Sequence, residues 1–275
     1  MERRQLNISI QGLLVLSLPL GSACSGPGEP PPPVRPGIEV LATDSVHLLD
    51  GLRVGLVTNH TGRTRDGTPS AVALRRAGVD LVALFAPEHG LGGQVTGGES
   101  FGDETEEVTA LPVYSLYGER RSPDPAILQE LDVLVFDVQD IRARYYTYVS
   151  TMIATMEAAA EEDIRLDVAD PPNPNGGLLV QGKVLDPEFA SFVGPYPVPM
   201  RHGMTTGELA RLVDAERGLE ADLHVVPAYG WSRGSWADET GIPWIATSPN
   251  MPTLESAIHY PGTCLFEGTN VSVGR

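Results

Sequence analysis

The chain has 275 residues, a net charge of −17, 41% hydrophobic residues and only two cysteines. A chain of this length can bury a real core as one large or two moderate domains. The negative charge argues against a protein that wraps nucleic acid or lies on an anionic membrane surface, because both partners need a basic face. We therefore expect a globular protein with no nucleic-acid partner.

The N-terminal residues have the pattern of an export signal. Two arginines precede an apolar stretch at residues 8–20, which is too short to cross a membrane, and small residues then complete a signal peptide of residues 1–23. Cys24 follows at the position of the lipidated cysteine of bacterial lipoproteins, and residues 24–37 form a Pro/Gly-rich tether. We expect an exported periplasmic or cell-envelope lipoprotein that contacts the membrane only through this anchor. Ordinary secretory cleavage is the alternative. If Cys24 carries lipid, Cys264 has no partner and the fold depends on its core.

Four short apolar runs in the first part of the chain predict a sheet. They span residues 53–58, 81–85, 133–138 and 164–168, and they alternate with helical stretches at residues 70–77, 125–131 and 146–162. Short continuous apolar runs in such an alternation are typical of buried parallel strands. The pattern predicts an α/β fold with a Rossmann-like, doubly wound parallel sheet and helices on both faces.

The composition changes after residue 170. A segment rich in proline, asparagine and glycine at residues 171–177 excludes regular structure. One helix at residues 206–216, capped by Thr205 or Thr206, and one strand at residues 223–227 follow. We expect a Rossmann-like catalytic domain at residues 38–177 and a smaller α+β domain at residues 178–275 that looks incomplete at its C-terminus.

Polar side chains follow each of the four apolar runs. They are Asn59 and His60, Glu88 and His89, Asp137 and Asp140, and Asp170 and Asn173. In open parallel sheets ligands bind beyond the carboxyl ends of the strands, so these groups are predicted to gather at one edge. For Glu88 the alternative is a structural role, either capping a turn or pairing with an arginine.

The third run leads into the densest polar and aromatic cluster of the chain. Asp137 and Asp140 precede Arg144, Tyr145 and Tyr146. Two carboxyl groups can act as acid and base, and tyrosine rings suit stacking on a sugar. The alternative is an Asp–Arg pair that holds a helix start, with the tyrosines in the core. For the nearby Tyr148 we expect the core. The glycine-rich residues 90–102 form a loop that is long enough to cover a substrate.

Several familiar cofactor motifs are missing from the sequence. The six histidines show no metal-ligand spacing, and there is no nucleophile elbow, no dinucleotide fingerprint and no P-loop. We predict no metal and no cofactor, and we keep a hydrolase with a metal bound by distant histidines and aspartates as a remote alternative.

Eight motifs in one order resemble the exo-β-N-acetylmuramidase family, long described as a domain of unknown function. They lie at residues 56–62, 86–90, 112–118, 136–140, 144–148, 173–177, 248–253 and 260–263. The resemblance covers residues 37–275. It implies a two-domain glycosidase that removes N-acetylmuramic acid from the non-reducing ends of peptidoglycan fragments, with its site in a cleft beside the Rossmann-like domain. The catalytic glutamate of the family corresponds to Glu88, and an implicated tyrosine corresponds to Tyr146.

The chain departs from the family pattern in three places. The family usually has Asp-Arg-Pro-Asn-Pro where this chain has Pro171 in place of the arginine. It usually has glycine where Arg142 stands. It also continues well beyond Arg275, so that this chain corresponds to part of a family member.

The residues and the resemblance predict the same reaction. Glu88 would protonate the leaving oxygen, and Asp137 or Asp140 would activate water or stabilise the transition state. Arg144 is the expected partner of the lactyl carboxylate of muramic acid, with Arg142 or Arg201 as substitutes. The other predicted substrate-binding residues are Asn59, His60, His89, Tyr145, Asn173 and Asn250. A non-catalytic cell-wall-binding lipoprotein is the alternative function, and no oligomeric state is predicted.

Overall fold

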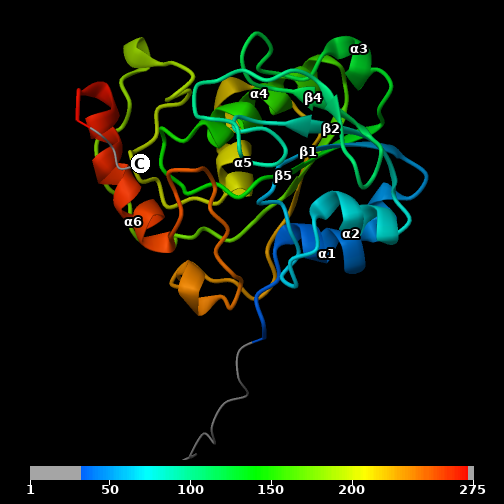
Figure 1. Cartoon of the computed structure of the whole chain (residues 1–275), viewed down its shortest axis with the longest axis horizontal. Coiled ribbons are helices and arrows are strands. Elements are labelled where there is room, and N and C mark those ends of the chain that lie inside the picture. The colour runs from blue at the N-terminus through cyan, green and yellow to red at the C-terminus, as the bar shows by residue number, and fades with distance from the viewer. Residues whose placement is uncertain (1–31, 272–275) are drawn as a thin grey trace, which may run out of the picture. The chain divides into compact units, whose positions relative to one another are not determined.

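One seven-stranded sheet forms the centre of residues 32–271, the part of the chain that the computed structural model describes (Figure 1). The strand order is β3-β4-β2-β1-β5-β6-β7. Its strands are β1 (Arg53–Thr58), β2 (Asp80–Ala86), β3 (Glu104–Thr105), β4 (Pro112–Ser115), β5 (Val133–Asp137), β6 (Arg165–Ala169) and β7 (Leu223–Val226). All neighbours pair in parallel except β3 and β4, which pair antiparallel. The order runs outward from β1 in both directions, which confirms the predicted doubly wound sheet.

The helices are α1 (Gly37–Thr43), α2 (Ser70–Arg76), α3 (Pro125–Leu128), α4 (Thr147–Glu161), α5 (Thr206–Arg217) and α6 (Leu254–Thr263). Short 3₁₀ turns lie at Val46–Leu49, Pro187–Phe189, Ala237–Glu239 and Cys264–Gly268. Helix α5 begins with a capping box, in which Thr205 Oγ1 accepts from Glu208 N–H and the Glu208 carboxylate accepts from Thr205 N–H. It ends at Gly218, whose φ of 62° suits glycine.

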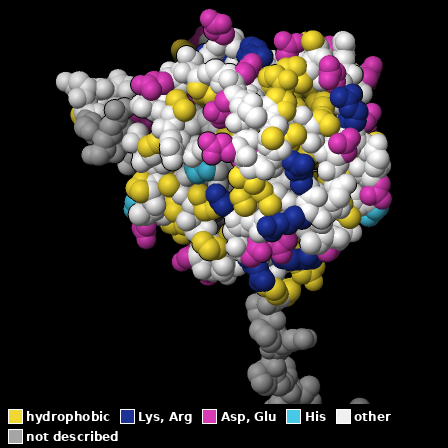
Figure 2. Space-filling model, turned by 45° about the vertical axis from the view of Figure 1, so that its right-hand side comes forward, with side chains coloured by type: hydrophobic (Ala, Val, Ile, Leu, Met, Phe, Trp, Pro, Cys, Tyr) yellow, Lys and Arg dark blue, Asp and Glu magenta, His cyan; other side chains and the backbone are white. Residues whose placement is uncertain are grey.

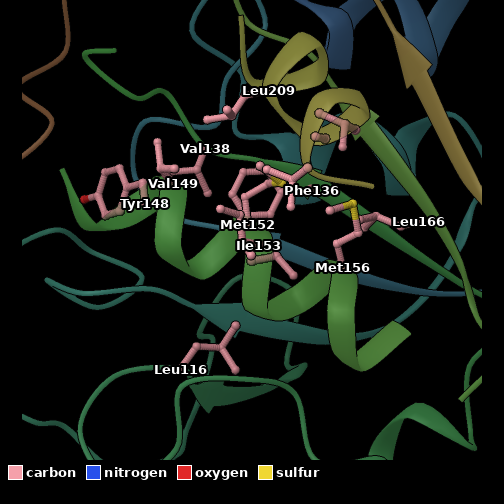
Figure 3. Close-up of a cluster of buried hydrophobic side chains, with 14 of the residues drawn as sticks. Leu116, Phe136, Val138, Tyr148, Val149, Met152, Ile153, Met156, Leu166 and Leu209 are labelled. Carbon is pink, nitrogen blue, oxygen red and sulfur yellow. The ribbon is translucent and has the colours of Figure 1, made fainter. Parts of the chain in front are cut away.

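The two faces of the sheet bury different residues of the same strands. Along β5, Val133 and Val135 pack with α1 and α2, whereas Leu134 and Phe136 pack with α4 and α5. Successive strand side chains point to opposite faces, so a strand covered on both faces reads as one continuous apolar run. Figure 3 shows the α4 side of this core, where Met152 and Met156 lie near Phe136 and Leu166.

Several predicted boundaries differ from the structure. The helix expected at residues 125–131 ends at Leu128. Strands β3 and β4, which form the edge of the sheet beyond β2, were not predicted. Strand β7, expected in a second domain, pairs with β6 and extends the same sheet. The predicted domain boundary after residue 177 therefore does not coincide with an edge of the sheet. The signal peptide and Cys24 lie outside the described residues.

The surface mixes charges of both signs. On the face in Figure 2, Lys and Arg side chains are interspersed with acidic and hydrophobic ones, so no continuous basic stripe crosses it. No helix in the described part of the chain is long and apolar enough to cross a membrane.

Candidate active site

Five of the predicted site residues line one cavity of about 510 Å³. They are Glu88, His89, Tyr145, Tyr146 and Asn250. Glu88 and His89 follow β2, and the two tyrosines lie between β5 and α4. The cavity therefore opens at the carboxyl edge of the sheet, where a parallel α/β sheet places its ligand site.

One backbone donor and one side-chain donor hold the carboxyl group of Glu88. Its Oε1 accepts a hydrogen bond of 2.9 Å from Gly98 N–H, and its Oε2 accepts one of 2.5 Å from Thr147 Oγ1. The residue is 8% exposed, and no arginine or lysine of residues 32–271 forms an ion pair with it. The alternative of an arginine-paired structural carboxylate therefore does not fit. Glu88 is instead fixed between the glycine loop and the first turn of α4.

The turn after β2 brings the glycine loop back over Glu88. His89 and Gly90 have φ of 74° and 73°, which reverses the chain, and His89 Nδ1 lies 2.8 Å from the carbonyl oxygen of Val95. A side chain at Gly97 would begin 3.7 Å from Glu88 Oε1. The loop predicted at residues 90–102 is thus confirmed, and it forms one wall of the cavity.

Tyr146 and Tyr260 line the cavity and pack with the buried ring of Tyr148. The ring of Tyr146 lies 5.0 Å from that of Tyr148 and 5.7 Å from that of Tyr260, both edge-on. The hydroxyl group of Tyr146 lies 2.7 Å from Thr247 Oγ1, and Tyr148 donates to the carbonyl oxygen of Thr247. Tyr148 is fully buried, as expected. Burial raises the pKa of Tyr146 above its usual range, so this phenol stays protonated.

Asp140 lies buried near these tyrosines but does not line the cavity. One of its carboxylate oxygens accepts from the backbone N–H of Arg142, and the other has no hydrogen-bond partner among the described residues. Burial raises the pKa of Asp140 to about 6, against the opposing charge of Arg142. Its negative charge in turn contributes to the raised pKa values of Tyr146 and Tyr148.

Asp137 belongs to a different cavity of about 90 Å³, which it lines with Thr61 and Gln139. Its carboxylate accepts a hydrogen bond from Ser70 Oγ, and burial raises its pKa to about 7. The structure separates Asp137 from the lining that contains Glu88, so the arrangement gives no support to Asp137 as the second catalytic carboxyl group.

We expect the Asp137→Asn variant to have a flatter dependence of stability on pH than the wild type. In the folded protein Asp137 keeps its proton up to about pH 7, whereas the unfolded chain releases it near the ordinary value of 3.8. The folded state therefore binds more protons in this window, and the wild-type free energy of unfolding falls as the pH rises from about 4 to 7. Three pKa units correspond to about 4 kcal/mol at most. Urea unfolding at pH 4.5 and pH 7.5 measures the loss, and an equal loss in both proteins would contradict the assignment.

Asn59 and His60 line another cavity of about 500 Å³. The side-chain oxygen of Asn59 accepts from the backbone and hydroxyl groups of Thr61, and His60 Nε2 lies 2.6 Å from the carbonyl oxygen of Ala246. Burial lowers the pKa of His60. Their side chains thus fix the turn after β1, and the structure does not bring them into the Glu88 cavity.

Arg144 and Asn173 make internal contacts instead of facing the cavity. Arg144 donates to the carbonyl oxygens of Lys183 and Val198, and its guanidinium stacks on the ring of Tyr145 at 5.2 Å. Asn173 is fully buried, where it accepts from the backbone of Asn175 and donates to that of Met204. The structure thus gives no support to Arg144 as the partner of the lactyl carboxylate.

The two substitutes for Arg144 are also engaged inside the protein. Arg201 donates to the backbone of Asn175, and Arg142 donates to Thr206 Oγ1 and to the carbonyl oxygen of Pro171. Arg142 has a φ of 59°, in the left-handed region that favours glycine. The guanidinium of Arg142 therefore reaches position 171, where the resembling family has an arginine.

The cavity also contains residues that the sequence reasoning did not single out. They are Tyr117, Thr147, Val193, Ser248, Met251, Tyr260, Glu267 and Val271, whereas Gly97 and Gly98 belong to the loop that was expected to cover a substrate. Tyr117 follows β4, so recognising residues 112–115 as a parallel strand would have placed it at the same edge. Thr147 is inside a quoted motif and directly follows Tyr146. Within residues 32–271, no group of three or more His, Cys, Asp and Glu side chains is placed to hold a metal ion.

A sequence profile described as "Exo-beta-N-acetylmuramidase NamZ, N-terminal" matches residues 54–255. The chain belongs to this family. Its Glu88 and Tyr146 lie within the matched NamZ segment, as does most of the cavity lining. A similar protein is the peptidoglycan β-N-acetylmuramidase NamZ of Bacillus subtilis strain 168, with 46% identity over 245 residues. That match covers 89% of this chain and 59% of the relative.

Two solved structures, both of DUF1343 family proteins from Bacteroides fragilis, are also similar to this NamZ-family chain. One superposes with a TM-score of 0.79 at 43% identity, covering 85% of this chain and 60% of the other. The second superposes with a TM-score of 0.75 at 35% identity, covering 88% and 64%. The chain therefore spans about three fifths of the length of these relatives.

Proposed function

We propose that the protein is an exo-acting glycoside hydrolase, which releases N-acetylmuramic acid from the non-reducing ends of peptidoglycan fragments in cell-wall turnover and recycling. The observation that carries the proposal is Glu88, a buried carboxyl group held by two donors in a cavity lined with tyrosines. Aromatic rings beside a carboxyl group are typical of carbohydrate sites. The substrate class comes from the family and from the name of the Bacillus relative.

Glu88 acts as the general acid in this proposal. It donates its proton to the glycosidic oxygen as the bond from that oxygen to C1 of the sugar breaks, and positive charge develops on the sugar ring. A water molecule then bonds to C1 and releases one proton, which gives free N-acetylmuramic acid and restores the acid form of Glu88. The bonds from Gly98 and Thr147 hold the carboxyl group in one orientation while this happens. The Thr147 hydroxyl group can also rotate to accept from the protonated carboxyl group, because a hydroxyl is both donor and acceptor.

Tyr146 and Asp140 both support the reaction, but only Tyr146 of the two lines the cavity. Tyr146 lines the cavity, and its raised pKa makes it a neutral hydrogen-bonding and packing surface instead of a phenolate nucleophile. Asp140 is the second carboxyl group of the proposal. Its charge acts on Tyr146 from outside the cavity lining and favours the positive transition state through the low-dielectric interior.

We further propose that the protein is exported as a lipoprotein anchored through Cys24. The proposal rests on the basic start, the apolar stretch at residues 8–20 and the small residues before Cys24. Metabolic labelling of the full chain with a fatty acid should mark the wild type and leave Cys24→Ala unlabelled. Equal labelling of both proteins would refute the anchor.

Hydrolysis of a chromogenic N-acetylmuramic acid glycoside tests the function, with a chelator added in a parallel reaction. We expect turnover that the chelator leaves unchanged. Binding of the sugar without turnover would favour a non-catalytic cell-wall-binding protein, and loss of turnover with the chelator would favour a metal-dependent hydrolase.

A further inference from the structure

The cavity around Glu88 has a negative lining. Glu88 and Glu267 belong to it, and no lysine or arginine of residues 32–271 does. Muramic acid differs from N-acetylglucosamine by a lactyl ether with a carboxylate, which needs a cationic partner at the cavity. The arginines expected from the sequence are held by backbone oxygens and the hydroxyl of Thr206 inside the protein. The recognition of the carboxylate therefore has to come from another element.

Arg121 lies on the segment after β4, outside the lining of this cavity. Its guanidinium carbon lies 4.4 Å from the centre of the Phe192 ring, and that ring lies 5.9 Å from the ring of Tyr117. Tyr117 in turn lines the cavity together with Glu88. A chain of two ring contacts therefore positions the guanidinium group next to the wall that contains the proposed acid.

The donors of Arg121 are available for a ligand. The residue is exposed, and within residues 32–271 its guanidinium group forms neither a hydrogen bond nor an ion pair. Its neighbour Arg120 differs in this respect, because it forms an ion pair with Asp103. Stacking on Phe192 limits the freedom of the Arg121 side chain while its planar N–H groups stay accessible.

The charges of Glu88 and Arg121 both affect the pKa of the Tyr117 phenol, in opposite directions. Burial and the neighbouring Glu88 carboxylate raise the pKa of the Tyr117 phenol to about 12, and the positive charge of Arg121 opposes this rise. One phenol therefore lies within range of both charges. A sugar substituent that extends from Glu88 past Tyr117 would therefore approach the positive charge of Arg121.

We propose that Arg121 binds the lactyl carboxylate of N-acetylmuramic acid and thereby selects this sugar over N-acetylglucosamine. The proposal rests on the proposed function and gives Arg121 the role expected for Arg144. It also narrows the substrate. When a peptide is attached, the lactyl carboxyl group becomes an amide and loses its charge, so Arg121 favours muramic acid without a peptide.

Two chromogenic glycosides test the proposal, one of N-acetylmuramic acid and one of the same sugar with the lactyl carboxyl group as a primary amide. We expect wild-type kcat/KM to favour the carboxylate roughly fivefold to tenfold, because one charge-assisted bond at a partly exposed site separates the substrates. In Arg121→Gln the ratio of the two kcat/KM values should fall close to one. It should fall because kcat/KM for the carboxylate substrate decreases, while kcat/KM for the amide substrate stays the same. Arg121→Lys keeps the positive charge but not the planar guanidinium group, which can bind a carboxylate through two N–H groups, and it should retain part of the preference.

Arg211→Gln is the matched control. Arg211 is an exposed arginine of α5 with no ion pair among the described residues, and its loss changes the net charge by the same amount. The control should keep the wild-type ratio. A preference that survives in Arg121→Gln, while wild type hydrolyses both glycosides, would overturn the role of Arg121 and leave the proposed function standing. No hydrolysis of either glycoside by wild type would overturn the function and this proposal together.

Discussion

Glu88→Gln is expected to fold normally and to lose most of the turnover of a muramic acid glycoside. Glutamine has nearly the same shape, so its amide oxygen can keep accepting from Gly98 N–H while its NH₂ group donates to Thr147 Oγ1, the other partner of Glu88. It cannot donate a proton as a carboxylic acid does, and the loss of general acid catalysis costs on the order of 10²–10⁴ in rate. The measurement is kcat/KM on a glycoside with a poor leaving group, for which protonation is essential.

Glu267→Gln is the control for this variant. Glu267 also lines the cavity, but among residues 32–271 its carboxylate has a single hydrogen bond, of 3.2 Å, from the hydroxyl group of Tyr260. We expect this control to stay within a few-fold of wild type. Near wild-type turnover by Glu88→Gln on the poor leaving group, with an unchanged thermal unfolding curve, would show that Glu88 is not the acid.

Arg142→Met is expected to lower the free energy of unfolding by about 3–5 kcal/mol, the cost of removing one partner from a buried set of charges. Arg142 is 1% exposed, and its charge acts on the buried carboxyl groups of Asp140 and Asp170. Burial already raises the pKa of both acids, and the substitution removes the charge that opposes this rise. Urea unfolding at pH 7 measures the effect.

The double variant Arg142→Gly with Pro171→Arg tests why the arginine stands at position 142. The guanidinium of Arg142 contacts the backbone of Pro171, and the left-handed φ of 59° at position 142 suits glycine. An arginine supplied from position 171 should therefore restore more than half of the stability that Arg142→Gly loses. A double variant no more stable than the single one would show that the two positions do not exchange this role.

The sheet could be predicted because its central strands are buried on both faces. Residues 133–137 are all apolar up to Asp137, and every one of them is buried. Strand β4 gives a weaker signal, because it begins with Pro112 and only Val113 and Ser115 are buried. Helix α6 contains Pro261, which reads as a helix breaker in a sequence. The local pattern therefore gives a weak signal for both elements.

The candidate site could be predicted only in part for a similar reason. The position of Glu88 follows from the end of a recognisable strand, so sequence order was enough to find it. The role of Arg144 depends on the carbonyl oxygens of Lys183 and Val198, which lie far along the chain. The accessible position of Arg121 likewise depends on Phe192, a contact that no local spacing indicates.

The most direct test of the account is the product formed from a disaccharide of N-acetylmuramic acid linked to N-acetylglucosamine, with the muramic acid at the non-reducing end. Mass spectrometry of the reaction with wild type should show both free sugars in equal amounts, and Glu88→Gln should leave the disaccharide intact. The reversed disaccharide, with N-acetylglucosamine at the non-reducing end, should remain uncleaved by wild type. Cleavage of the reversed disaccharide at a similar rate, or binding of the first disaccharide without cleavage, would contradict an exo-acting muramidase.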